Sequence, residues 1–206
     1  MLAVMPVEKL TRERRRQQTR DVLIAAATEV FARRGFEGAA LEEIAETAGF
    51  TRGAIYKHFH DKEDLFFAVT DRLNEQVIDA FRTIAADSQS PDDWDIARLA
   101  ALWRSSVDGE FEDLFFAIGK EYELYVLRNL DARPRAVAHR RRQRDLVASF
   151  IDEVAEQSGM TLRLPSATLA AIVLAAADGL TYTARIDGDD LFAPFLELLN
   201  AGMVRD

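Results

Sequence analysis

Apolar residues recur along this chain at the spacing of an α-helix. In the segment 11–34 they fall at i, i+1, i+4, i+8 and i+9, which is one stripe of a helix: Val22, Leu23, Ala26, Val30 and Phe31. No segment alternates apolar and polar residues as a half-buried strand would, and clusters of β-branched residues are few. The pattern therefore predicts an all-α fold of about nine helices.

Residues that begin or end helices divide the rest of the chain. Gly35 ends the first helix and Gly49 ends a short second one, because glycine is the usual residue just after a helix. Thr51 and Asp61 stand where side chains cap the start of a helix. We therefore predict a loop at 88–93, a long helix after residue 61, and helices over about 41–48, 52–59, 92–107, 111–130, 134–157, 166–186 and 191–199.

Composition narrows the class of protein. The chain has 206 residues and lacks cysteine, so disulfides, thiol catalysis and cysteine-bound zinc are excluded. Its longest unbroken apolar run, Leu169 to Ala177, is nine residues long, whereas a membrane span needs about 20. The first residues do not form a secretory signal. We therefore expect a cytoplasmic protein that does not enter a membrane.

Charge is distributed unevenly along the chain. The net charge is −9, yet residues 1–62 carry 11 basic and 9 acidic residues, a net of +2, and residues 63–206 carry a net of −11. Such asymmetry indicates two parts with different partners. We therefore predict one domain over 1–62 and a second over 63–206, of which the first could meet phosphate through a local basic face.

The segment 41–59 reads as a helix, a glycine turn and a second helix. On a wheel of 100° per residue Ile55 and Phe59 share the inner side, whereas Gly53 and Lys57 point outward. A short turn forces the helices to cross steeply, which is helix-turn-helix geometry. The spacing alone leaves two interpretations open, a DNA-binding motif and a structural corner between two helices.

A longer set of residues adds a resemblance. The run Gly35-Phe36, Leu41-Glu-Glu-Ile-Ala, Ala48-Gly49, Gly53-Ala-Ile-Tyr56-Lys-His-Phe59 and Lys62-Glu-Asp-Leu-Phe66 resembles the N-terminal domain of TetR/AcrR-family transcriptional regulators over about residues 15–67. The resemblance implies a homodimer in which a three-helix head binds DNA and a helical body regulates it. Carried over by position, the DNA-binding residues are Thr51, Arg52, Ala54, Tyr56, Lys57, His58 and Lys62. One departure is Ala40, where the family commonly has Thr or Ser.

The function expected from this resemblance is sequence-specific DNA binding. We expect a repressor that binds a palindromic operator as a dimer and is released by a small molecule; the alternative is a constitutive or protein-responsive regulator without a ligand. An enzyme has no support, because no nucleophile elbow or glycine-rich phosphate loop occurs. No metal or other cofactor is expected, since His58 and His60 diverge on a helix and no suitably spaced third ligand lies near.

Two basic runs have two interpretations each. Arginines between Arg12 and Arg20 could form a solvated helix face or an arm that follows DNA. The run 139–144 could be a solvated face or pair with an acidic patch, or it could be a second nucleic-acid contact.

An aromatic stripe could be core or ligand pocket. Seven of the nineteen aromatic residues lie between Trp94 and Tyr125. A pocket for a small apolar or aromatic effector would be lined by Trp103, Phe111, Phe115, Ile118, Tyr122 and Tyr125, and the same helical spacing also suits a packed core.

The helix over 166–186 is apolar all round, so both of its sides need cover. The resemblance implies that the last two helices pair with those of a second copy in a four-helix bundle. The residues assigned to this dimer interface are Ala170, Val173, Leu174, Ala177, Phe192, Phe195, Leu196 and Leu199.

Overall fold

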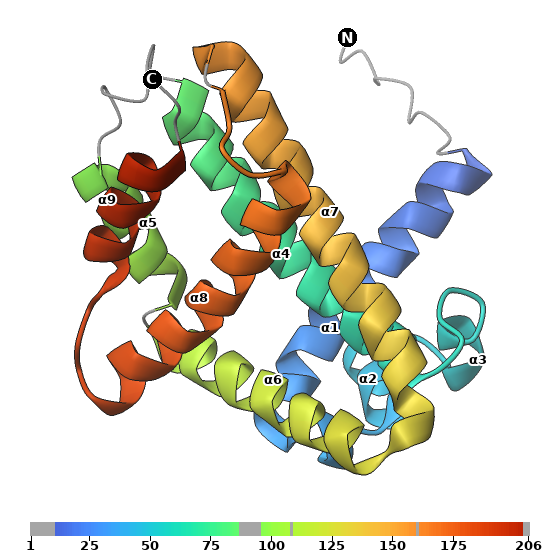
Figure 1. Cartoon of the computed structure of the whole chain (residues 1–206). Helices are drawn as coiled ribbons and strands as arrows, with labels where there is room; N and C mark the ends of the chain where they lie inside the picture. The colour runs from blue at the N-terminus through green and yellow to red at the C-terminus, as the bar shows by residue number, and fades with distance from the viewer. Residues whose placement is uncertain (1–10, 87–95, 108, 160, 204–206) are drawn as a thin grey trace, which may run out of the picture. The chain divides into compact units, whose positions relative to one another are not determined.

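The computed structural model describes residues 11–86, 96–107, 109–159 and 161–203 (Figure 1). Within these ranges the chain forms nine α-helices and no β-strand, which confirms the all-α prediction. The helices are α1 (Arg12–Gly38), α2 (Leu41–Thr47), α3 (Arg52–Ile55), α4 (Lys62–Ala86), α5 (Ile96–Val107), α6 (Glu110–Arg128), α7 (Arg133–Ser158), α8 (Ser166–Ile186) and α9 (Phe192–Met203). The loop predicted at 88–93 lies outside the described residues.

Two compact units make up the chain, residues 1–69 and 70–206. Their boundary falls inside α4, so this helix contributes its first two turns to unit 1 and the remainder to unit 2. The domain boundary expected from charge lies at residue 62, at the start of the same helix.

Unit 1 contains α1, α2, α3 and the start of α4. The predicted stripe of α1 is buried except for Val22, which is exposed. Gly35 interrupts α1 with a φ of 72°, a backbone conformation that glycine adopts without a side-chain clash. Asp61 caps α4 as predicted, since its Oδ1 accepts a hydrogen bond of 3.0 Å from the amide of Asp64.

The third helix is shorter than predicted. It ends at Ile55, and residues 56–58 continue as turns. The amide of Lys57 donates to the carbonyl of Ala54 at 3.3 Å, an i to i+3 bond that tightens the chain after the helix. The amide of Phe59 still donates to Ile55 at 2.9 Å, so Phe59 stays on the inner side.

Unit 2 contains the rest of α4 and helices α5 to α9. Helices α7 and α8 pack on each other around Ala148, Ile151, Leu169 and Ala170. Helix α5 packs on α9, where the rings of Trp103 and Phe192 stack with centroids 4.4 Å apart. The predicted break near residue 131 is a 3₁₀ turn, η2 (Leu130–Ala132).

Among the described residues, α8 is the one helix long and apolar enough to cross a membrane by length and composition. A single helix of this kind is also common in the core of soluble folds. The two sides of α8 have different surroundings in unit 2. Leu174 and Ala177 line a cavity, whereas Ile172 and Tyr182 are exposed.

Candidate nucleic-acid interface and internal cavity

Helix α3 presents an exposed polar face opposite two buried residues. Ile55 is fully buried and Phe59 is buried, as the helical wheel predicts. Thr51, Arg52, Gly53, Tyr56 and Lys57 are exposed, and Ala54 and His58 are half-buried. No other part of unit 1 described in the structure covers this side of α3, so it is open to a partner molecule.

Arg52 is held by two neighbours on this face. Its Nη1 lies 2.6 Å from Glu42 Oε1 of α2, and its Nη2 donates to the hydroxyl of Tyr56 at 3.1 Å. The hydrogen bond to Tyr56 and the charge of Glu42 raise the pKa of Arg52 above its ordinary value. Arg52 is therefore oriented along α3 and paired with a carboxylate, rather than being a freely moving side chain.

His58 lies in a positively charged environment. Burial lowers its pKa below the ordinary value of 6.5, and the charges of Arg16, Arg20 and Lys57 lower it further. The guanidinium of Arg20 also stands 5.0 Å from the ring centre of Phe59. Cations from α1 and from the turn after α3 therefore surround a neutral imidazole.

We expect DNA binding by this chain to strengthen as pH falls from about 7.5 to 5.5. Phosphates near His58 would offset the surrounding positive charge and raise its pKa, so binding would take up a proton. Without DNA the sign is opposite: folding lowers this pKa, so the unfolded chain binds more protons below about pH 6.5 and stability falls there. DNA titrations across this pH range measure the first effect.

The matched variants for this prediction are His58→Gln and His60→Gln. His60 is highly exposed and lies two residues further on. We expect His58→Gln to flatten the pH dependence and His60→Gln to leave it. Equal pH dependence in both variants would exclude His58 as the proton acceptor.

Lys62 is engaged within unit 1. Its ammonium donates to the backbone carbonyls of Glu37 at 2.9 Å and Ala39 at 3.1 Å, and lies 5.0 Å from the ring centre of Phe36. These bonds hold the connection between α1 and α2 against the start of α4. Lys62 thus has a structural task in addition to the phosphate contact expected from the resemblance.

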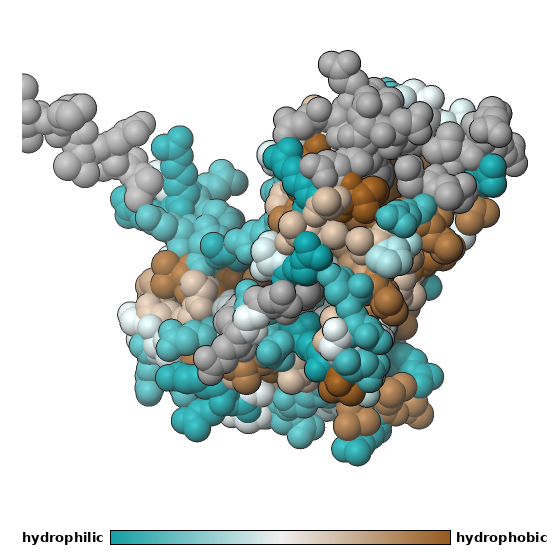
Figure 2. Space-filling model, turned by 90° about the vertical axis from the view of Figure 1, so that its left-hand side faces the viewer, coloured by the Kyte–Doolittle hydropathy of each residue, from teal (hydrophilic) through white to brown (hydrophobic). Residues whose placement is uncertain are grey.

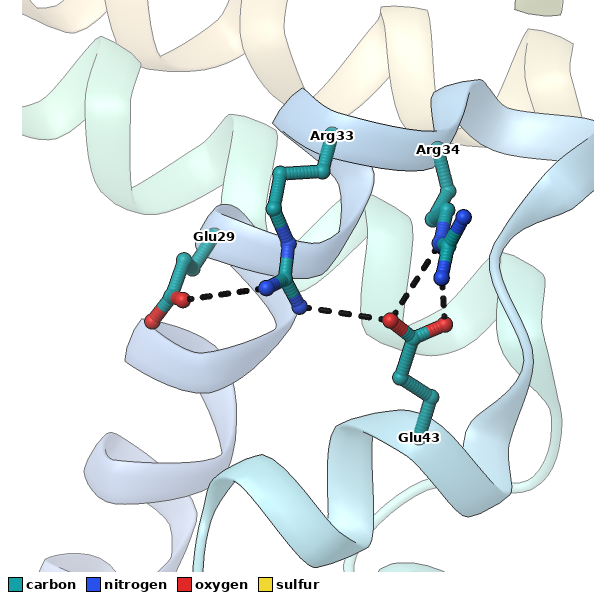
Figure 3. Close-up of polar contacts among 4 residues, drawn as sticks. All are labelled: Glu29, Arg33, Arg34 and Glu43. Atoms are coloured by element: carbon teal, nitrogen blue, oxygen red, sulfur yellow. Dashed lines mark hydrogen bonds and ion pairs between the residues drawn. The ribbon is translucent and has the colours of Figure 1, made fainter.

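The end of α1 is fastened to α2 by ion pairs (Figure 3). Glu43 of α2 accepts from Arg33 at 3.2 Å and, through both oxygens, from Arg34 at 3.3 Å, while Arg33 also lies 3.7 Å from Glu29. The basic residues at the end of α1 therefore orient α2. Ala40 stands at the N-cap of α2 and makes no side-chain cap, so this helix starts without the hydroxyl that Thr or Ser would supply.

The N-terminal arginines are helical and exposed from Arg12 to Arg16. The second basic run is not uniform. His139 is buried, and its Nε2 lies 2.8 Å from Asp71 Oδ1 and 3.2 Å from Thr70 Oγ1, while Arg140 is exposed. The solvated-face interpretation of the run therefore fails for His139.

Unit 2 contains two neighbouring cavities, both partly open to solvent. The wide cavity, about 550 Å³, is bordered by residues of α4, α5, α6, α7 and α8. The apolar cavity, about 260 Å³, is bordered by residues of α4, α5, α7, α8 and α9. Both have volumes in or near the range of small-molecule sites.

The predicted pocket residues divide into two groups. Trp103 lines both cavities and Phe115 lines the wide cavity. Ile118 and Tyr122 are instead buried in the core, and Tyr125 lines neither cavity. The side chain of Phe111 lies outside the described residues.

The difference comes from the rotation of α6. The residues of α6 that face the wide cavity are Glu112, Phe115, Phe116, Gly119, Lys120 and Glu123. At 100° per residue their mean direction lies about 120° from that of the stripe through Ile118, Tyr122 and Tyr125. The aromatic stripe is therefore mainly core, and the cavity lies beside it.

The residues assigned to the dimer interface are buried or line the apolar cavity in the single chain, and the interface itself stays a prediction. Ala170 and Phe192 are buried, and Val173, Leu174, Ala177, Phe195, Leu196 and Leu199 line the apolar cavity together with Phe192. The outward face carries Ile172, Tyr182, Ile186 and Leu198, which are exposed. Figure 2 shows apolar side chains that reach the surface among polar ones.

Sequence reasoning did not find Asn74 and Gln143, which line both cavities. Asn74 follows Leu73 on α4. Gln143 lies among arginines on α7, three and four residues before Leu146 and Val147, and so shares their side of the helix. A single polar residue in an otherwise apolar stripe was the available signal.

Unit 1 contains a helix-turn-helix with an exposed polar face, and unit 2 is helical and contains cavities. This combination is typical of DNA-binding regulators. A family model described as "Bacterial regulatory proteins, tetR family" matches residues 23–69. The HTH-type transcriptional repressor AcnR of Corynebacterium diphtheriae is 31% identical over 150 residues, which cover 68% of this chain and 75% of that protein. The chain belongs to the TetR family.

Other relatives match only a short segment of the sequence, whereas the similar solved structures cover nearly the whole chain. The regulators ArpR and TtgR of Pseudomonas putida are 43% and 49% identical, and the chain spans 36% and 28% of their lengths. The structure resembles that of the fatty acid degradation regulator FadR from Bacillus halodurans, with a TM-score of 0.62 and 20% identity over 95% of this chain and 98% of that one. The structure of a TetR-family member from Streptomyces coelicolor A3 gives 0.60, with 19% identity over 92% and 99%. These structures support the fold.

Proposed function

We propose that this chain is a DNA-binding transcriptional repressor. The observation that carries the proposal is the exposed and half-buried face of α3 and its flanking residues. Thr51, Arg52, Ala54, Tyr56, Lys57 and His58 form this face around the buried Ile55 and Phe59. Gly53 and Ala54 are small enough to let α3 approach bases in a major groove. Tyr56 and Lys57 would reach phosphates, Arg52 a base edge, and Lys62 the backbone beside α4.

The test of DNA binding is a selection of bound sequences from random duplexes, followed by titration on the selected and on a scrambled duplex. We expect a preference for a palindrome, because two copies would present two α3 helices. Lys57→Ala should weaken binding to both duplexes and reduce the log–log salt slope by about one. Binding without sequence preference would contradict the proposal.

We propose further that the effector site is formed by the two cavities. A fully packed unit 2 is what the constitutive or protein-responsive alternative requires, so the cavities favour a ligand. Helix α4 offers a physical link. Leu65 and Phe66 are buried in unit 1, whereas Thr70, Leu73 and Asn74 of the same helix line the wide cavity. A ligand that prefers one position of α4 would therefore shift the DNA-binding equilibrium.

The proposed dimer uses the exposed face of α8 and α9. We expect sedimentation at micromolar concentration to show a species of about 46 kDa, twice the chain mass of 23.2 kDa. The double variant Ile172→Asp with Leu198→Asp should give the monomer, because buried carboxylates would face each other across the interface.

The matched control for the dimer is Leu124→Asp with Leu127→Asp on α6. Both leucines are also exposed. This control should remain dimeric. A monomeric wild-type chain, or equal dissociation in both double variants, would exclude the proposed interface and with it the palindromic operator.

A further inference from the structure

The two cavities of unit 2 are adjacent. They share the six lining residues Asn74, Val77, Trp103, Gln143, Leu174 and Ala177. We refer to the place that these residues surround as the junction. A ligand long enough to pass the junction would contact both cavities, so the chemistry of the two sides together defines what fits.

The apolar cavity has no charged lining residue among the described part of the chain. Apart from Asn74 and Gln143, its lining consists of aliphatic and aromatic side chains such as Ile78, Phe81 and Leu196. Placing a charge there would carry its full desolvation cost. The part of a ligand that enters this cavity is therefore an uncharged hydrocarbon chain or ring.

The wide cavity contains cations, and each has a carboxylate partner. Lys120 donates to Glu123 at 3.1 Å and to Asp178, and the Nε of Arg185 donates to Asp113 at 2.7 Å. The charged lining residues of this cavity are two cations and three carboxylates. An anionic head group would therefore compete with existing ion pairs in surroundings of net negative charge.

A cationic head group in the wide cavity would meet two opposing effects, attraction to the three carboxylates and repulsion from Lys120 and Arg185. Lys120 lies 5.2 Å and Arg185 4.8 Å from the ring centre of Phe116, so this aromatic ring already receives two positive charges. A third cation would meet Lys120 and Arg185 as like charges.

The junction provides hydrogen bonds without charge. Asn74 of α4 and Gln143 of α7 make no hydrogen bond with any described residue, and both are half-buried. Each carboxamide has donors and an acceptor. A ligand that forms hydrogen bonds with these carboxamides would bind with a more favourable free energy. A hydroxyl, ketone or ester oxygen suits both side chains.

We propose that the effector is an uncharged amphiphile whose hydrocarbon part fills the apolar cavity and whose oxygen group is bound by Asn74 and Gln143. The proposal rests on the proposed function in taking the two adjacent cavities as the effector site. Its test measures binding to the full chain directly, so it does not depend on release from DNA.

The probes are three compounds with a ten-carbon chain that differ in the head group: 1-decanol, decanoate and decyltrimethylammonium. At pH 7.5 the alcohol is kept below its solubility limit and the two ions below their critical micelle concentrations. Binding is measured from the shift in Tm and from the fluorescence of Trp103 in a Trp94→Phe background. We expect decanol to raise Tm and change the fluorescence, with at least about tenfold weaker binding of the two charged probes. Preference for either charged probe, or binding of none, overturns the proposal.

Variants then test the junction itself. Asn74→Leu and Gln143→Leu preserve approximate size, and each should weaken decanol binding about threefold to tenfold. Gln157→Leu, an exposed glutamine further along α7, is the matched control and should bind as the wild type does. Each variant is accepted only if its ligand-free Tm shows a folded chain. Unchanged decanol binding in both junction variants contradicts the assignment of the oxygen group.

Two further outcomes separate this proposal from the proposed function. If decanol binds and the selected DNA is not released, the effector chemistry stands and the ligand-relieved mechanism fails. If decanoate both binds best and releases DNA, the mechanism stands and the uncharged effector is wrong.

Discussion

Replacing Phe66 by alanine should unfold unit 1 under conditions in which the wild-type chain binds DNA. Phe66 is buried, and its ring meets those of Phe31 and Phe36 edge-on, with centroids 5.4 and 5.1 Å apart. Removing a buried phenylalanine side chain leaves a void and costs about 3–5 kcal/mol. Whole domains are stable by only about 5–15 kcal/mol, and small ones bury the least surface. Operator binding should therefore be lost at 37 °C.

Amide hydrogen exchange locates this effect. We expect exchange to accelerate in residues 23–69 of the Phe66→Ala variant, with much smaller changes in residues 136–155 of α7. Phe50→Ala is the control, since Phe50 is exposed in the turn before α3 and its removal should change stability by less than about 0.5 kcal/mol. Wild-type exchange throughout unit 1 would show that the aromatic cluster is not what holds this unit together.

The elements that could be predicted from sequence are those with local signals. Gly35 and Gly49 have φ values of 72° and 71°, which only glycine adopts readily. A single glycine was therefore enough to predict each turn. Asp61 caps α4 through an amide three residues away. The inner face of α3 was predictable because Ile55 and Phe59 contrast with polar neighbours within one turn.

The faces of α6 and α8 could not be predicted in the same way. Helix α8 is apolar all round, so its periodicity does not distinguish the side toward Leu174 and Ala177 from the side toward Ile172 and Tyr182. On α6 the aromatic stripe is the strongest pattern, yet a cavity needs small and polar residues such as Gly119, which give a weak pattern. Hydrophobicity locates buried surface, and it does not separate packed surface from cavity wall.

Contacts between residues far apart in the sequence could not be predicted either. Lys62 binds carbonyls of Glu37 and Ala39, more than twenty residues earlier, and backbone acceptors leave no trace in the sequence. Asp71 and His139 pair across 68 positions. Such contacts depend on how helices pack, which local spacing does not determine.

Replacing Glu42 by glutamine should strengthen DNA binding through Arg52. In the described structure Glu42 lies 2.6 Å from the guanidinium that is expected to read a base edge, so binding must break this pair and bring a carboxylate toward phosphates. Glu42→Gln removes both costs while keeping a similar shape. We expect operator affinity to rise about threefold to tenfold at low salt and less at high salt, because both costs are electrostatic. Arg52→Ala should lower operator affinity about 5-fold to 150-fold and relax the preference at one base pair.

A double-mutant cycle separates release of Arg52 from simple removal of charge. In the Arg52→Ala background, Glu42→Gln should lose most of its benefit if the benefit comes from freeing Arg52. Glu46→Gln is the matched control, because Glu46 is exposed on the same helix and makes no ion pair with a described residue. Its effect should be small and equal on selected and scrambled duplexes. If Glu42→Gln and Glu46→Gln raise affinity equally, and the gain persists without Arg52, the pair does not restrain Arg52 and α2 acts on DNA only through its overall charge.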